Sequence, residues 1–247
     1  EQLMRRTLAV MDKYNVVKAV ASGSRVMVQR WQLAAPGRFI PGYETQASNL
    51  TVQSLQTLRR HIQSDSVQVL AEIVSQSRGI SPSDSALEPL YNLAEEFDIP
   101  IGIHVGLGPP GAAQAGFPQY RMRLSSALLL EDALVRHPRL RLYVMHDGWP
   151  LLDDIVALLY SYPQVYVDVG VIDWYIPRAE FYSYLKRLID AGFSKRIMFG
   201  SDQMQWPESI GTAIEAIESA DFLTLEQKRD ILYNNAARFL SLDSQNK

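Results

Sequence analysis

Two histidines and three carboxylates stand where short apolar segments of the sequence end, and these residues are the best suited to chemistry. His104 closes IGIH and His146 closes LYVMH, with a glycine two residues further on in each case. Glu72 ends VQVLAE, Asp168 lies in VYVDVG, and Asp202 follows the apolar run of KRIMFGSD. Imidazole nitrogens and carboxylate oxygens are ligands of zinc and similar divalent ions. The alternative is that the two histidines are core residues bonded to the backbone.

The segments that would position these side chains alternate between two patterns. Short apolar runs predict strands near residues 16–21, 38–40, 67–73, 100–104, 141–146, 165–169 and 196–200. Helical spacing and helix start signals predict helices near residues 2–14, 50–63, 81–97, 121–136, 151–160, 178–190, 207–219 and 224–240. Residues 26–48 otherwise read as loop. The alternation predicts βαβ units in a parallel sheet, and the lack of a linker predicts a single domain over residues 1–247.

Seven strands with their helices predict an α/β fold, a (β/α)8 TIM barrel that lacks its first strand in this sequence. The chain opens on a helix where a barrel would normally open on a strand, so we expect that strand upstream of Glu1. A doubly wound open sheet is the alternative. In a barrel the carboxyl ends of all strands meet at one mouth, which would gather the histidines and carboxylates into one ring.

Composition narrows the classes of function. The net charge of −3 gives no basis for binding nucleic acid or an anionic membrane. The chain has no cysteine and no apolar run long enough to span a membrane, which leaves a small molecule as the expected partner. GLGPPG matches a dinucleotide-binding glycine pattern at residues 106–111, but Pro109 and Pro110 block the helix that this pattern must open. We expect a cytoplasmic location, with any targeting segment upstream of Glu1.

Other polar and aromatic residues give weaker signals. Trp149 and Trp206 each precede a proline and closely follow His146 and Asp202, so they are either core residues or aromatic walls of a substrate pocket. Arg25 follows the first strand and is either an anchor for a substrate carboxylate or a surface residue. The remaining histidines, His61 and His137, lie on a polar helix face and at a helix end, which favours structural roles.

Taken together, the motifs resemble the amidohydrolase-related (amidohydrolase 2) family of metal-dependent TIM-barrel hydrolases, which includes aminocarboxymuconate semialdehyde decarboxylase-like proteins. The segments that carry the resemblance are IGIHVG, YVMHDGWPLLDD, QVYVDV, RIMFGSD and ILYNNAARFL, in this order. The resemblance implies that His104 and Asp202 ligate a divalent ion, with zinc expected and manganese as the alternative. Glu72 falls where some relatives place a carboxylate ligand. The family's H-x-H pair has no counterpart here, and the expected upstream strand is where it would belong.

The resemblance also implies a reaction. We expect a metal-dependent hydrolase that activates a water at the barrel mouth to cleave an ester, lactone or amide bond. Asp202 would take the proton of the water, and His146 would polarise the substrate carbonyl or stabilise the developing oxyanion. One alternative is a metal-dependent decarboxylase of an aromatic or unsaturated carboxylic acid, and another is a non-catalytic barrel that has lost its metal site. The resemblance allows a homo-oligomer as well.

Overall fold

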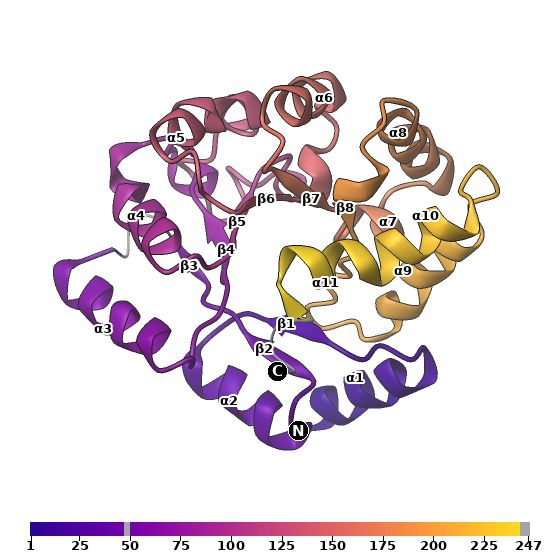
Figure 1. Cartoon of the computed structure of the whole chain (residues 1–247), viewed down its shortest axis with the longest axis horizontal. Coiled ribbons are helices and arrows are strands. Elements are labelled where there is room, and N and C mark those ends of the chain that lie inside the picture. The colour runs from indigo at the N-terminus through magenta and orange to yellow at the C-terminus, as the bar shows by residue number, and fades with distance from the viewer. Residues whose placement is uncertain (47–49, 243–247) are drawn as a thin grey trace. The chain divides into compact units, whose positions relative to one another are not determined.

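The computed structural model describes residues 1–46 and 50–242 of the chain. The chain divides into two compact units, each described by itself (Figure 1). Unit 1 comprises Glu1–Val17 with Tyr166–Lys247, and unit 2 comprises Lys18–Val165. Unit 2 carries the candidate metal ligands Glu72, His104 and His146, whereas Asp202 lies in unit 1.

Parallel strands form the centre of unit 2. Strand β1 (Ala19–Ala21) pairs with β2 (Phe39–Pro41). Strands β3 (Thr45–Gln46), β4 (Leu70–Val74), β5 (Ile101–His104) and β6 (Leu142–Met145) pair with one another in chain order. Most apolar side chains of β4, β5 and β6 are fully buried, including those of Leu70, Ile101, Ile103 and Val144. Continuous apolar runs of this kind are typical of parallel strands that are covered on both faces.

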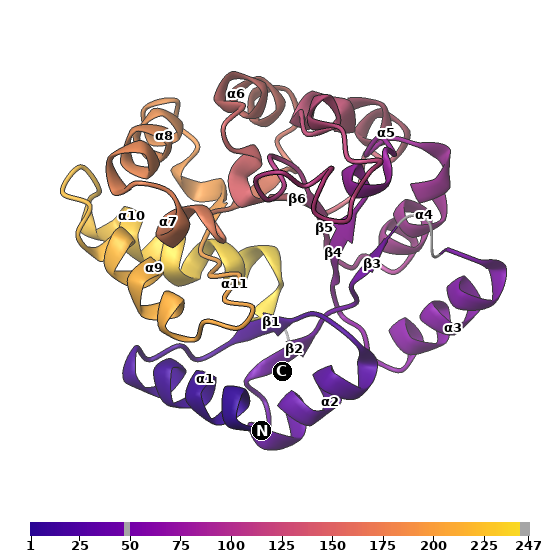
Figure 2. The same ribbon diagram turned by 180° about the vertical axis from the view of Figure 1, so that it is seen from behind.

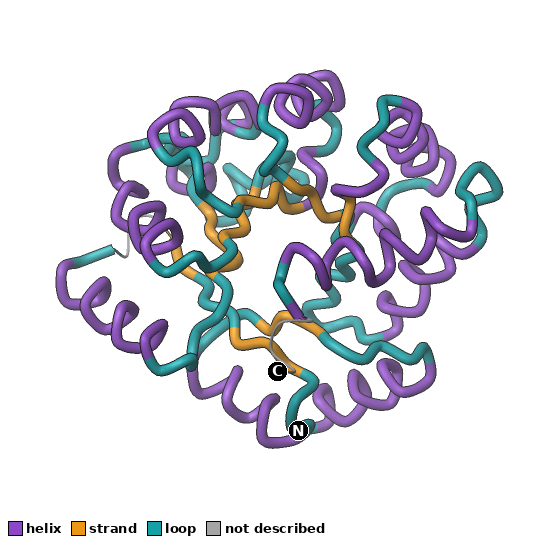
Figure 3. Tube along the Cα trace, viewed as in Figure 1, coloured by secondary structure: helices purple, strands orange, loops and turns teal. Residues whose placement is uncertain are grey.

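Helices connect the strands of unit 2 and lie alongside them (Figures 1 and 3). The α-helices are α2 (Arg25–Ala34), α3 (Val52–Gln63), α4 (Glu88–Glu96), α5 (Glu131–Arg136) and α6 (Leu152–Ser161). Short 3₁₀ turns add η2 (Gln76–Arg78), η3 (Ser85–Leu87), η4 (Met122–Leu124), η5 (Ala127–Leu130) and η6 (His146–Gly148). The start of α3 shows how local sequence sets these bounds, because Thr51 and Ser54 cap each other's backbone N–H groups.

Unit 1 combines the first helix of the chain with the C-terminal part. Strand β7 (Tyr166–Asp168) pairs in parallel with β8 (Ile197–Met198). The helical segments are α1 (Gln2–Lys13), α7 (Ile172–Tyr175), α8 (Arg178–Asp190), η7 (Ser194–Arg196), α9 (Glu208–Glu218), α10 (Leu225–Arg229), the π-helix η8 (Asp230–Asn234) and α11 (Asn235–Phe239). Helix α1 contacts α9 through Tyr14, whose hydroxyl donates to Glu215 at 2.8 Å. Gly211 makes room for this ring, since a Cβ there would lie 2.5 Å from it.

The predicted strands and most of the predicted helices are present, with ends that differ by a few residues. The interpretation of residues 26–48 as loop was wrong, because α2 occupies much of this stretch and begins where the Ser24 side chain accepts from the N–H of Met27. The helix predicted at residues 121–136 is two 3₁₀ turns followed by α5, and the one at 224–240 is interrupted by a π-helical turn. None of the described helices is both long and apolar enough to cross a membrane.

Candidate metal centre

Three of the predicted site residues lie together in unit 2: Glu72 is the third of the five residues of β4, His104 is the last residue of β5, and His146 follows β6 directly. The Nε2 atom of His146 is 3.1 Å from Nδ1 of His104 and 3.5 Å from Oε1 of Glu72. The same Glu72 oxygen also contacts Nδ1 of His104. The two imidazole rings meet edge-on, with centroids 4.5 Å apart and planes at 70°. One carboxylate and two imidazoles therefore converge on a single point.

Strand order and register explain this convergence. Strands β4, β5 and β6 are neighbours and run parallel, so their carboxyl ends lie at the same edge. His104 is the last residue of β5 and is opposite Met145, and His146 comes one residue later. The backbone of His146 and Asp147 then turns with φ values of 59° and 52°, a left-handed conformation that ends the strand abruptly.

The electrostatics of Glu72 favour an ionised carboxylate. Burial on its own raises the pKa of this carboxyl group, but hydrogen bonds from His104 and His146 and the charges of these imidazoles lower it by more. The pKa of Glu72 is therefore held well below its usual range. At neutral pH the group is an anionic oxygen donor that faces two nitrogen donors.

The spacing of two of the three donor pairs fits a divalent ion. Two ligand atoms that each lie about 2.1 Å from one ion are about 3.0 Å apart at a right angle and about 3.4 Å apart at the tetrahedral angle. The separations of 3.1 and 3.5 Å from His146 match this range, and all three donor atoms lie within 4.8 Å of one another. The third pair, Oε1 of Glu72 and Nδ1 of His104, is closer than this range and would have to separate for both atoms to bind one ion. Imidazole suits zinc and carboxylate suits manganese, so the donor set admits both metals.

Asp202 lies in unit 1, four residues after the end of β8. Two glycines allow it to approach Asp168 at the end of β7. A Cβ on Gly200 would lie 3.3 Å from the Cα of Gly170 and 3.4 Å from Cγ of Asp168. A Cβ on Gly170 would lie 3.0 Å from Oδ1 of Asp168 and 3.5 Å from Cβ of Asp202. The close approach of two backbone segments thus requires small residues at both positions.

A third carboxylate, which was not predicted from the sequence, lies beside this pair. Asp173 on α7 is only 1% exposed, and neither of its carboxylate oxygens has a hydrogen-bond partner among the described residues. Burial, together with the charges of Asp168 and Asp202, raises the pKa of Asp173 well above its ordinary value. The sequence offered no signal for this residue, because α7 is a single helical turn without a periodic pattern.

The aromatic residues near Asp202 form a cluster in unit 1. The indole Nε1 of Trp174 donates to the carbonyl of Ser201 at 2.6 Å, and the rings of Trp174 and Trp206 have centroids 6.1 Å apart. Trp206 is 54% exposed, so it is not a core residue. In unit 2, Trp149 follows His146 closely, and its backbone carbonyl accepts from the N–H of Leu107 at 3.1 Å. Contact of either tryptophan with a substrate stays a prediction.

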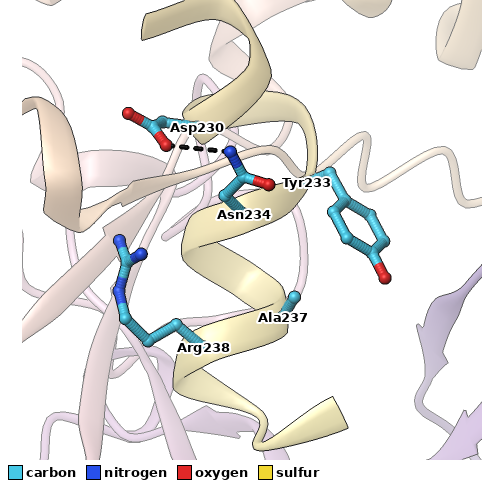
Figure 4. Close-up of a pocket in the computed structure, with 5 residues that line it drawn as sticks. All are labelled: Asp230, Tyr233, Asn234, Ala237 and Arg238. Carbon is cyan, nitrogen blue, oxygen red and sulfur yellow. Dashed lines mark hydrogen bonds between the residues drawn. The ribbon is translucent and has the colours of Figure 1, made fainter. Parts of the chain in front are cut away.

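Two further features bear on a candidate site: Arg25 in unit 2 and a pocket in unit 1. Arg25, the first residue of α2, donates from Nη1 to the carbonyl of Ser66 at 2.6 Å, and its predicted role as a substrate anchor stays a prediction. A pocket of about 290 Å³ in unit 1 lies along the helix that contains η8 and α11 (Figure 4). Its lining residues are Asp230, Tyr233, Asn234, Ala237 and Arg238. Within the described part of the chain, none of the predicted site residues lines this pocket.

Comparison with known proteins identifies the family. The chain matches the amidohydrolase family over residues 1–242, and it therefore belongs to this family. A curated relative, Protein fluG from Emericella nidulans, is 23% identical over an alignment of 162 residues, and the match covers 59% of this chain and 18% of the relative. The chain thus spans less than a fifth of the length of that relative.

Solved structures show the fold. An uncharacterised TIM-barrel protein from Bordetella bronchiseptica has a TM-score of 0.75 and 16% identity, with 98% of this chain and 90% of the other chain covered. A 5-carboxyvanillate decarboxylase from Novosphingobium aromaticivorans, solved with manganese and 4-hydroxy-3-methoxy-5-nitrobenzoic acid, has a TM-score of 0.68 and 16% identity. That comparison covers 96% of this chain and 79% of the decarboxylase. These similarities confirm the predicted TIM-barrel class over the open-sheet alternative.

Proposed function

We propose that this member of the amidohydrolase family is a metal-dependent enzyme that binds one divalent ion at Glu72, His104 and His146 and acts on a small molecule. The observation that carries the proposal is the convergence of one carboxylate and two imidazoles within 4.8 Å. When bound, the ion would supply Lewis acidity toward a water or a carbonyl oxygen. A core role for the two histidines would not require an ionised carboxylate beside both of them.

The residues of the chain have distinct tasks in this proposal. Glu72 supplies negative charge, which offsets the charge of the ion, and the imidazoles of His104 and His146 supply nitrogen donors. The proximity of His146 to the other two donors favours a role as ligand over one as carbonyl polariser. A role of Asp202 as metal ligand and proton acceptor stays a prediction, which rests on the resemblance of RIMFGSD to the family motif. The exposed ring of Trp206 is proposed to contact an apolar part of the substrate.

Two reactions are compatible with this chemistry. Hydrolysis of an ester, lactone or amide is the reaction that the family description suggests. Decarboxylation of an aromatic acid is the second candidate, and the solved structures favour it because several of the similar proteins are decarboxylases. The two reactions also correspond to two candidate metals. Zinc is the metal expected from the sequence, and manganese is the metal with which a decarboxylase of this fold was solved. A cytoplasmic location and a homo-oligomer stay predictions.

Metal content tests the proposal directly. The protein is loaded with zinc or manganese, dialysed and analysed by atomic emission. We expect about one ion per chain, and its loss in His104→Ala. His61→Ala is the matched control, because His61 lies on α3 and hydrogen-bonds to Ser66 instead of contacting the three donors. Retention of the ion in His104→Ala, or its absence from the loaded wild type, would refute the metal site.

Substrate panels separate the two reactions. Lactones, esters and amides are offered to the loaded protein alongside hydroxybenzoic and methoxybenzoic acids. Hydrolysis of lactones and esters is followed by proton release, hydrolysis of amides by the free amine, and decarboxylation by the carbon dioxide produced. Activity against one panel that is lost in His104→Ala assigns the reaction. A loaded protein that is inactive against both panels would favour the non-catalytic alternative.

A further inference from the structure

A buried polar contact joins the three connections that follow the metal-ligand strands in unit 2. The side chain of Gln76 is 1% exposed, and its Nε2 donates to the carbonyl of Gly106 at 2.8 Å. The N–H of Gly106 donates to the carbonyl of Ser125 at 3.0 Å. The next residue, Leu107, donates its N–H to the carbonyl of Trp149 at 3.1 Å. We call Gln76, Gly106, Leu107 and Trp149 the Gly106 hub.

Each of the three connections that meet in the hub begins at one of the three donor residues (the "arms" of the hub). Gln76 comes four residues after Glu72, Gly106 two residues after His104, and Trp149 three residues after His146. Figure 2 shows the long connection between β5 and α5 close to β5 and β6, where the last two of these arms lie. The hub therefore ties together the short segments that carry the metal donors.

The hub has little freedom to relax. Gly106 has a φ of 110°, and a Cβ at this position would lie 2.9 Å from the carbonyl oxygen of Trp149 and 3.1 Å from the carbonyl carbon of Gly148. The β5 connection therefore rests directly on the backbone of the β6 connection. Gln76 holds the same glycine from the β4 side, and the amide must present its NH₂ group, since a carbonyl accepts hydrogen bonds and does not donate them.

The amide of Gln76 is not held by a wider network. Its Oε1 atom is buried without a hydrogen-bond partner among the described residues, and so is the hydroxyl oxygen of the neighbouring Ser75. A buried polar group that makes one bond and leaves its other end unpaired costs stability compared with an apolar residue of similar size. Among the described residues, the bond to Gly106 is thus the contact that accounts for a glutamine at this position.

We propose that Gln76 is a positioning residue which, through Gly106, sets the spacing of Glu72, His104 and His146. This inference rests on the proposed metal function of these three residues. Supporting groups around metal ligands typically change metal affinity by about 10- to 100-fold when they are replaced. Gln76 has the same effect through the backbone of the β5 connection instead of through a direct bond to a ligand.

Cobalt binding tests the inference, because the visible spectrum of Co²⁺ reports the geometry of its ligands. Gln76→Leu removes the donor at similar length, and Gln76→Glu places a carboxylate opposite the Gly106 carbonyl. We expect both variants to bind Co²⁺ about 10- to 100-fold more weakly and with a changed spectrum. The control is Leu90→Val, which loses packing at a fully buried position of α4 and leaves the hub intact. Wild-type affinity and spectrum in both Gln76 variants would overturn the inference.

A second measurement separates this inference from the proposed function. If the wild type binds no cobalt, the proposed metal function fails, and the ring ¹⁵N resonances of His104 and His146 are compared in metal-free protein. A shift of both rings in Gln76→Leu, with no shift in Leu90→Val, supports positioning by Gln76. Unchanged rings in Gln76→Leu overturn it.

Discussion

His137 offers a test of how the unit 2 helices are held together. The ring lies between two glutamates of α4, with Nε2 2.9 Å from Oε2 of Glu88 and Nδ1 3.5 Å from Oε2 of Glu95. The Nε2 contact with Glu88 is within hydrogen-bond distance, whereas the Nδ1 contact with Glu95 is longer. Its side chain is 6% exposed, and it also contacts the ring of Tyr91 at a centroid distance of 5.8 Å.

His137→Phe keeps an aromatic ring beside Tyr91 and removes both nitrogens. A hydrogen bond to a charged group is worth about 1.5–3 kcal/mol. The longer contact with Glu95 adds less, about 0.2–1 kcal/mol, as for a partly exposed ion pair. Glu88 and Glu95 keep contacts with Arg136 and Arg139, which limits the cost of the lost partner. We therefore expect the variant to lose about 2–3 kcal/mol of unfolding free energy at pH 7.

The effect has a defined dependence on pH. Burial raises the pKa of Glu88, but hydrogen bonds from His137 and Arg136 lower it below its ordinary value of 4.5, and Glu95 is lowered as well. Lowered carboxyl pKa values give stability that is present above pH 4.5 and is lost as the pH falls through the folded-state values. The difference between wild type and His137→Phe should therefore shrink below pH 4.5.

Urea unfolding at pH 7 and at successively lower pH values, followed by circular dichroism, measures this difference. His137→Gln is the matched variant, because its amide can still donate to Glu88 but offers one polar group in place of two ring nitrogens. We expect it to lie between wild type and His137→Phe at pH 7. Equal urea midpoints for wild type and His137→Phe at pH 7 would refute a stabilising role of the two ring nitrogens. A difference that persists undiminished in acid would refute the role of the two carboxylates.

Three further variants have defined outcomes. Asp173→Asn should unfold at higher urea concentration than wild type at pH 8, with a smaller gain at pH 5. The reason is that the pKa of Asp173 is raised in the folded state, so wild-type stability falls as the pH rises from the ordinary pKa of 3.8 through the folded-state pKa. A variant less stable than wild type at pH 8 would contradict this. Gly106→Ala should lose about 1–3 kcal/mol in urea unfolding, since its φ of 110° is strained for any side chain, and an unchanged midpoint would argue against the close contact with Trp149. Glu72→Gln should bind zinc or manganese at least about 10-fold more weakly in calorimetric titrations, because it replaces an anionic donor by a neutral one, and wild-type affinity would remove Glu72 from the site.

The order of the strands accounts for what sequence analysis could predict. Apolar runs such as IGIH and LYVM are buried on both faces, so they are recognisable without any structure. Because parallel strands pair here in chain order, residues at the ends of successive runs become neighbours, which is why Glu72, His104 and His146 could be selected from sequence. Helix α2 was missed for the opposite reason. Its large apolar residues Val26 and Leu33 are exposed by 61% and 81%, so no apolar stripe marks a buried face.

The residues that sequence analysis missed depend on contacts between loops. Gln76 meets Gly106 across 30 positions of the chain, and neither residue belongs to a periodic pattern. His137 was interpreted as a residue that complements a helix end, and its partners Glu88 and Glu95 lie more than 40 positions earlier. The pKa of Asp173 is raised by burial and by the charges of Asp168 and Asp202. The positions of Asp168 and Asp202 in the sequence do not predict that Asp173 is buried. Such contacts follow from tertiary packing, which periodicity does not encode.

The proximity of the metal donors to the hub has a thermodynamic consequence. An ion held by Glu72, His104 and His146 would also hold together the connections that Gln76 joins through Gly106. A ligand that binds only the folded state adds about 2.7 kcal/mol of stability at 100 times its dissociation constant. Because Gln76 variants are expected to bind the ion about 10- to 100-fold more weakly, they should gain less stability from added metal than the wild type does. Leu90→Val, whose defect lies on α4, should gain as much from added metal as the wild type does, because its metal affinity is unchanged.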